Sequence, residues 1–151
     1  MPGMARWGEF ASAAPELAAF GAGRFAALPA YLATVRPTGA PRVHPVTPIV
    51  ADGGLFLFME PTSPKGTDLR EQGWYALHSG VPDRHGSGGE FSVSGRGTLT
   101  DEPGDRAAAA RAAGYEPADR YVLFELSVAE ARCTGYGDVV LPVPGRWKAT
   151  G

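Results

Sequence analysis

The chain has 151 residues, a length typical of one folded domain that buries a core without metal or disulfide staples. With 14 basic and 16 acidic residues the formal net charge is -2, and no block of like charge marks a surface for nucleic acid or anionic membrane. The single cysteine, Cys133, excludes an intrachain disulfide and a cysteine-rich metal site, and we expect it to be a small, partly buried residue.

Glycine and proline are frequent, at 21 and 14 residues, but regular apolar runs lie between them. This combination favours a β-rich chain with many turns over a disordered one. Residues 1–7 lack a long apolar core, so we expect no secretory signal, and every apolar stretch is too short to span a bilayer. We therefore expect a cytoplasmic protein by default.

The N-terminal part of the chain is predicted to be helical. Residues 7–20 carry large apolar side chains at helical spacing and divide into two pieces. Pro15 is suited to the first turn of the second piece, where its missing N–H would be unpaired in any case. Gly21 and Gly23 are expected to end the helix.

After these helices the period of the apolar pattern becomes that of extended strands. Asp52-Gly53 is a strong signal for a tight hairpin turn. The strand over residues 55–59 is apolar on both faces and should be buried on both, so a helix or a second subunit must cover its outer face. The six predicted strands are residues 31–36, 42–50, 55–59, 74–79, 90–100 and 121–128.

Two further helices are predicted between these strands. Residues 63–71 form a short helix, and a second helix runs over 103–113, with Asp101 as its N-cap and Gly114 at its end. The fold class is therefore mainly β with a few helices. We expect one domain, residues 1–151, built on a closed or nearly closed six-stranded antiparallel barrel, with helices 7–20 and 103–113 outside it.

The second predicted strand contains Pro45 and Pro48, and proline cannot donate to a β-ladder. The strand must be frayed, bulged or at an open seam, where free backbone groups can meet the polar edge of a planar heterocycle. An edge strand without any ligand explains the same pattern equally well.

An anion site is predicted over the segment from Thr62 to Lys65. Ser63 is placed as an N-cap, Pro64 as the first helical residue and Lys65 in the first turn. The N-terminus of a helix attracts phosphate through its unpaired N–H groups and partial positive charge. The alternative is an ordinary capped helix with a solvated lysine.

The three histidines, His44, His78 and His85, match no metal-binding spacing, so we expect no metal site. No nucleophile elbow or Walker-type glycine loop is present. His44 shares a strand face with Arg42 and is the one histidine expected near a ligand. His78 is interpreted as structural and His85 as solvated.

Four segments taken together resemble the pyridoxamine 5′-phosphate oxidase-like family, whose members are flavin-binding split barrels. The resemblance extends from about Trp7 to Val128 and rests on the order and spacing of the segments. The segments are Tyr31-Leu32-Ala33-Thr34-Val35-Arg36, Gly39-Ala40-Pro41-Arg42-Val43-His44-Pro45-Val46, Ser63-Pro64-Lys65-Gly66-Thr67-Asp68-Leu69-Arg70 and Gly89-Glu90-Phe91-Ser92-Val93-Ser94-Gly95-Arg96.

The resemblance implies a homodimer with two cofactor sites at its interface. In such a dimer, residues 42–46 would lie along the flavin, and Ser63 and Lys65 would hold its phosphate. Glu90 stands where the family has a glutamine that reaches the partner subunit's cofactor. The implied cofactor-binding residues are Arg42, Val43, His44, Pro45, Val46, Met59, Glu60, Ser63, Lys65, Glu90 and Trp147.

The tail Arg146-Trp147-Lys148 lacks the histidine of the oxidase substrate motif, so pyridoxamine phosphate is not the expected substrate. The resemblance implies an FMN-dependent oxidoreductase or, with a different cofactor, a deazaflavin-dependent reductase. A non-enzymatic flavin carrier, a sensor or a haem-handling barrel is the alternative of another class. No catalytic residue is assigned, although Arg42 is hypothesised to stabilise a reduced flavin anion.

Overall fold

The computed structural model describes residues 3–151, so residues 1 and 2 of the predicted domain lie outside it. Its helices are α1 (Trp7–Ala13), α2 (Pro15–Ala27), α3 (Pro64–Glu71) and α4 (Pro103–Ala112). Its strands are β1 (Ala30–Val35), β2 (Pro41–Val46), β3 (Ile49–Ala51), β4 (Gly54–Met59), β5 (Trp74–Ser79), β6 (Glu90–Thr100), β7 (Val122–Leu126), β8 (Glu130–Thr134) and β9 (Arg146–Lys148).

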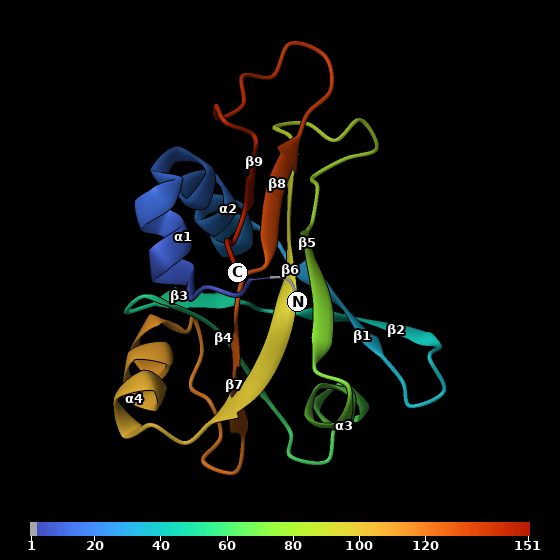
Figure 1. Ribbon diagram of the computed structural model, residues 1–151, viewed down its shortest axis with the longest axis vertical. Coiled ribbons are helices and arrows are strands. Elements are labelled where there is room, and N and C mark those ends of the chain that lie inside the picture. The colour runs from blue at the N-terminus through green and yellow to red at the C-terminus, as the bar shows by residue number, and fades with distance from the viewer. Residues whose placement is uncertain (1–2) are drawn as a thin grey trace.

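The strands form one curled antiparallel sheet (Figure 1). The order is β2-β1-β5-β6-β7-β4-β3, and β8 pairs with β6 and β9. The long strand β6 connects the two halves of the sheet, because residues 90–96 pair with β8 and β5 whereas residues 97–100 pair with β7. The expected mainly-β architecture is confirmed, with the helices packed around a half-barrel.

The predicted number of strands was wrong. The expected strand over 42–50 is divided at Thr47 and Pro48 into β2 and β3, because Pro48 has no N–H with which to continue a ladder. The short strands β8 and β9 were not predicted at all. They are short and contain few large apolar residues; β8 is held by pairing with β6, and β9 by pairing with β8.

The position of β2 explains why it tolerates Pro45. This strand is at one end of the sheet order and pairs only with β1, where Pro45 lies opposite Tyr31. A proline at the edge of a sheet forfeits no ladder bond on its open side. The expected open seam is thus an edge strand, with backbone groups available beside the start of α3.

The doubly apolar strand β4 is covered within the chain itself. Leu55 and Leu57 point into the main core, whereas Phe56 packs with Ala109 of α4 in a second apolar cluster. Each of these side chains is 1% exposed or less. A helix therefore covers the outer face of β4, and this strand gives no reason to expect a second subunit.

The helix boundaries differ from the predictions at two places. Helix α2 continues through Gly21 to Ala27, because Gly21 lies against the Phe91 ring, where a Cβ would come within 2.5 Å of ring atoms. Glycine here permits close packing of helix on sheet and does not end the helix. Helix α4 begins at Pro103 as predicted, but its N-cap is Glu102 and not Asp101.

No helix within residues 3–151 has the length and apolar character needed to cross a bilayer.

Candidate functional site

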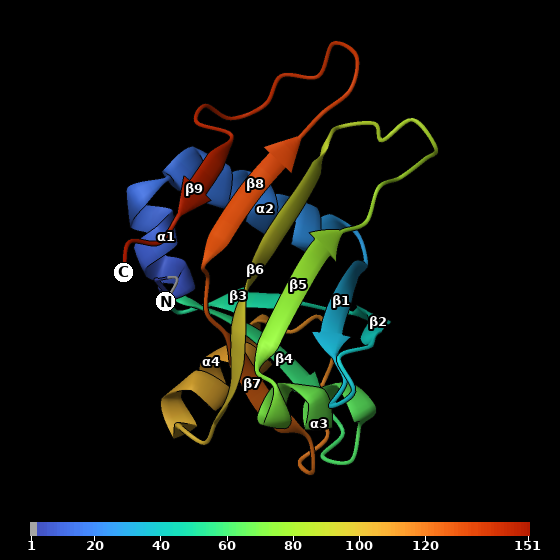
Figure 2. The same ribbon diagram turned by 45° about the vertical axis from the view of Figure 1, so that its right-hand side comes forward.

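A cavity of about 420 Å³ lies between the β1–β2 turn and the start of α3. Figures 1 and 2 both show α3 beside the end of β1. Among residues 3–151, three basic side chains line this cavity and no acidic side chain does. Its lining residues are Arg36, Pro41, Arg42, Val43, His44, Pro64 and Lys65. The arrangement favours an anionic ligand.

The first turn of α3 is built as the sequence predicts. Pro64 is the first helical residue, and the Ser63 hydroxyl accepts a hydrogen bond of 3.2 Å from the Gly66 N–H. Lys65 is half-buried at the cavity wall, and this burial lowers its pKa. Within residues 3–151 no carboxylate lies within ion-pair distance of Lys65, so its charge is free to meet a ligand.

Arg42 is held in place by a buried carboxylate on α3. The Arg42 Nε donates to Asp68 Oδ2 at 2.8 Å, and the Thr34 hydroxyl donates to the same oxygen at 2.7 Å. Burial raises the pKa of Asp68, but the hydrogen bonds from Arg42 and Thr34 outweigh it and the pKa is lowered overall. The terminal nitrogens of Arg42 remain for a ligand, since only Nε contacts Asp68.

His44 lies at the open side of the cavity. Its pKa is lowered below the ordinary value of 6.5, first by repulsion from the Lys65 ammonium, then by burial and by the charge of Arg42. The imidazole is therefore neutral near pH 7. It adds hydrogen-bonding groups to the cavity without adding a fourth positive charge.

Four of the residues predicted from the sequence line this cavity together: Arg42, Val43, His44 and Lys65. Ser63 is buried directly below, as the cap of α3. Arg36 was missed by the sequence reasoning. The sequence did offer a sign of its role, because Arg36 is a basic residue at the end of a predicted strand, just before the turn at Thr38-Gly39. A hairpin at that turn places it near the start of the strand that carries Arg42.

The structure places Met59 and Glu60 outside the lining of the cavity. Met59 is 3% exposed, and its sulfur lies under the first turn of α3, 3.1 Å from the position of a Cβ at Gly66. The Glu60 carboxylate accepts hydrogen bonds from both Nε and Nη2 of Arg120, and these bonds lower its pKa. Pro45 and Val46 lie farther along β2, beyond the cavity.

Glu90 and Trp147 lie far from Lys65 within the chain. Glu90 is the first residue of β6, and β6 begins at the opposite end of the sheet from α3 (Figure 2). The Glu90 Oε1 atom lies 3.5 Å from Nε2 of His78. The Trp147 ring packs on Phe10, with ring centroids 5.1 Å apart, and so lies against α1. Neither residue belongs to the anion cavity of its own chain.

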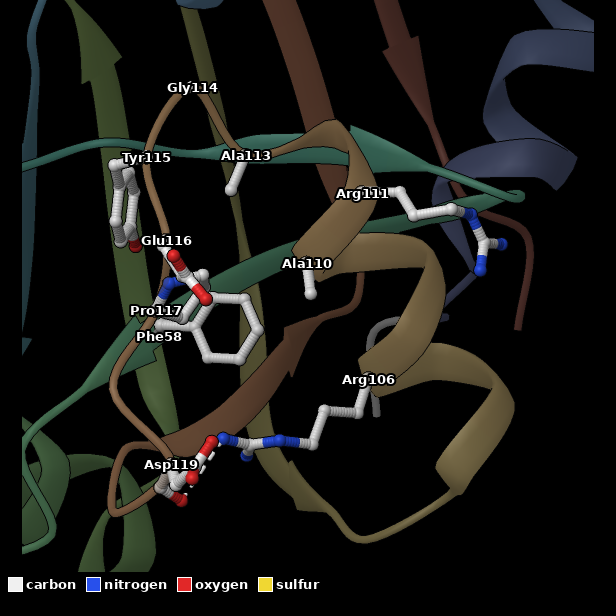
Figure 3. Close-up of a pocket in the computed structure, with 10 residues that line it drawn as sticks. All are labelled: Phe58, Arg106, Ala110, Arg111, Ala113, Gly114, Tyr115, Glu116, Pro117 and Asp119. Carbon is white, nitrogen blue, oxygen red and sulfur yellow. Dashed lines mark hydrogen bonds between the residues drawn. The ribbon is translucent and has the colours of Figure 1, made fainter.

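A second cavity, of about 620 Å³, is bounded by α4 and the segment that follows it (Figure 3). Two arginines line it, and one of them, Arg106, donates to the carbonyl oxygens of Tyr121, Ala118 and Asp119 at 2.7–3.3 Å. The same guanidinium lies 5.2 Å from the centroid of the Phe58 ring. Arg106 thus fixes the segment that leads to β7, and we regard the smaller cationic cavity as the functional site.

Among residues 3–151 there is no group of three His, Cys, Asp or Glu side chains close enough together to bind a metal ion.

No protein-family model and no curated protein matches this sequence. Solved structures do match its fold. The heme binding protein from Mycobacterium smegmatis superimposes with a TM-score of 0.63 at 21% identity, over 79% of this chain and 55% of that one. This chain thus spans about half the length of that protein.

Two further structures are similar. PhzG from Burkholderia lata 383, in complex with tetrahydrophenazine-1-carboxylic acid, gives a TM-score of 0.56 at 17% identity, over 82% of this chain and 77% of that one. A NimC/NimA family protein from Clostridium acetobutylicum gives 0.61 at 16% identity, over 78% and 87%. Such low identities show the fold alone, which is a split β-barrel.

Proposed function

We propose that this protein binds FMN, with the 5′-phosphate in the cationic cavity, and that it serves as an oxidoreductase of the split-barrel type. The observation that carries the proposal is that Arg36, Arg42 and Lys65 line one cavity, whose lining includes no acidic side chain in the described part of the chain. A phosphate monoester bears about 1.5 to 2 negative charges near neutral pH and complements this set. Deazaflavin-dependent reduction is the variant of this proposal with another cofactor.

The residues present fit such a cofactor. Lys65 and the terminal nitrogens of Arg42 would hold the phosphate beside the first turn of α3. Val43 and His44, on the edge strand β2, would then border the rest of the molecule. A bound flavin supplies hydride or electron transfer, whereas the protein binds and orients it. The shared cavity of Arg42 and Lys65 favours a phosphate-side role for Arg42 over contact with the ring.

A homodimer is the second part of the proposal. The outer face of β1, β5 and β6 is uncovered within the chain, with Tyr31 49% and Trp74 39% exposed. Ala33, Ala76 and Ser94 form one cross-strand row of small residues between them, which permits close approach of a second sheet. A second copy on this face would also explain how residues far from Lys65 in one chain, such as Glu90, could reach a cofactor of the other.

Replacing Ala76 by arginine is expected to convert the dimer to a monomer, because a bulky charge would be introduced at the centre of that row. Sedimentation analysis at micromolar concentration measures the change. Ala107→Arg, on the exposed face of α4, is the matched control and should leave the mass unchanged. A wild-type protein that sediments as a monomer would refute the dimer, and a dimer in Ala76→Arg would refute this interface.

Visible absorption of the protein mixed with FMN or with haem tests the cofactor class directly. Binding of FMN at micromolar concentration supports the proposal, and its failure refutes it. A haem carrier is the second candidate, favoured by the likeness to the mycobacterial heme binding protein. A Soret band that persists through gel filtration, with no flavin uptake, would establish that candidate instead.

Lys65→Ala is expected to weaken FMN binding by about 1.5–3 kcal/mol, or roughly 10- to 150-fold, because it removes a charge-assisted hydrogen bond to phosphate. Quenching of flavin fluorescence gives the dissociation constants. Lys148→Ala is the matched control, since Lys148 is exposed on β9 away from the cavity. Equal dissociation constants for wild type and Lys65→Ala would remove this lysine from the site.

A further inference from the structure

Arg36 lines the cationic cavity at a backbone position that the hairpin holds in place. It follows the last residue of β1, and its N–H donates to the Ala40 carbonyl at 2.9 Å. Its own carbonyl accepts from the Gly39 N–H at 2.8 Å, which closes the turn. The Cα of Arg36 is thereby fixed at the rim, and its exposed side chain lines the cavity with Arg42 and Lys65.

The charges around the cavity do not cancel. Asp68 is the carboxylate that pairs with Arg42, and both its short hydrogen bonds, from Arg42 and Thr34, use the same oxygen. Within residues 3–151 neither Arg36 nor Lys65 has a carboxylate within ion-pair distance. With one carboxylate against three cations, the cluster retains an excess of two positive charges.

We propose that Arg36 makes this cavity selective for a terminal, doubly charged phosphate monoester over a singly charged phosphate diester. The inference rests on the proposed function and narrows its ligand. Removing Arg36 would leave an excess of one positive charge, enough to balance a diester but not a monoester dianion. Since the cavity is open to water, charge matching here changes affinity by modest factors and not by orders of magnitude.

The selection separates the candidate cofactors by their chemistry. FMN ends in a phosphate monoester, whereas the deazaflavin cofactor carries a phosphate diester. A site that requires the second negative charge on the phosphate therefore binds FMN in preference to the deazaflavin cofactor. Because His44 is neutral near pH 7, it neither supplies nor replaces the charge of Arg36.

The test compares FMN with its monomethyl phosphate ester, which has the same ring and chain but one negative charge less. Wild-type protein is expected to bind FMN about tenfold more tightly than the ester at low ionic strength. Arg36→Met should weaken FMN binding about 5- to 10-fold and ester binding about twofold, which reduces the preference to about twofold to fourfold. Arg36→Lys should retain most of the wild-type preference for FMN over the ester, because it keeps the positive charge.

Arg84→Met, in the exposed loop between β5 and β6, is the matched control and should keep the wild-type preference. Equal affinity of the wild type for FMN and the ester would overturn the inference while leaving the proposed function intact. An unchanged preference in Arg36→Met would remove Arg36 from this role. If the wild type binds neither compound, the proposed function fails and this inference fails with it.

Discussion

Phe91→Ala is expected to lower the free energy of unfolding by about 3–5 kcal/mol, the largest change anticipated for a single side chain in this protein. Phe91 is 0% exposed, and its ring centroid lies 5.4 Å from that of Phe25 and 6.1 Å from that of Trp7. Gly21 of α2 packs directly on the ring. Phe91 therefore attaches both N-terminal helices to β6, and its removal leaves a cavity that rigid backbone on both sides cannot fill.

Urea unfolding followed by tryptophan fluorescence measures this change as a shift in the transition midpoint. Tyr136→Ala, which removes an aromatic ring that is 56% exposed, should change the stability by less than about 0.5 kcal/mol. A loss below about 1 kcal/mol for Phe91→Ala would mean that α1 and α2 contribute little to the stability of the half-barrel.

Asp68→Ala is expected to cost about 3 kcal/mol of stability and to weaken phosphate binding as well. The Asp68 side chain is 2% exposed whereas that of Arg42 is 27% exposed, so the value lies at the lower end for a broken buried ion pair. Without the carboxylate, Arg42 loses the hydrogen bond that orients it and Thr34 loses its acceptor. The carboxylate therefore positions a cation without touching the ligand.

Asp68→Asn removes the negative charge but keeps the size of the side chain. The pH dependence of the unfolding free energy then shows whether the charge itself stabilises the fold. The native environment lowers the pKa of Asp68 below its ordinary value of 3.8, so the ionised carboxylate stabilises the fold above about pH 4. This stabilisation is lost as the pH falls through the native pKa. The gap in unfolding free energy between wild type and Asp68→Asn should therefore be large at pH 7 and shrink below pH 4. A constant gap across this range would contradict the role of the charge.

The anion site shows which part of a binding site a sequence can predict. Ser63, Pro64 and Lys65 act within one turn of one helix, so their roles follow from local chemistry, and the capped start of α3 is confirmed. Arg36 and Asp68 escaped prediction because they meet the site only through pairing and packing. Asp68 lies on the buried side of α3, where sequence alone gives no sign that it faces Arg42 across the chain.

The strands likewise divide into those that local sequence predicts and those that depend on tertiary contacts. Residues 74–79 and 90–100 were predicted at their observed bounds, because each is a short run of strand-forming residues between turn signals, and residues 90–94 also alternate polar and apolar side chains. The strand 42–50 was predicted as one piece, because its apolar pattern continues through the break at Pro48. The short strand β8 depends on pairing with β6, and β9 depends on pairing with β8, so neither leaves a comparable signal in the sequence.

By itself the sequence determined a mainly-β chain with a strand interrupted by prolines, a capped helix and a cation at its first turn, because each of these follows from chemistry within a few residues. Tertiary structure alone decided that α4 covers the outer face of β4, that Gly21 admits Phe91, and that three basic residues from separate elements share one cavity. These are contacts between residues far apart in sequence. They depend on how the sheet curls and on which side chains fill the space between its layers, and no local pattern encodes either.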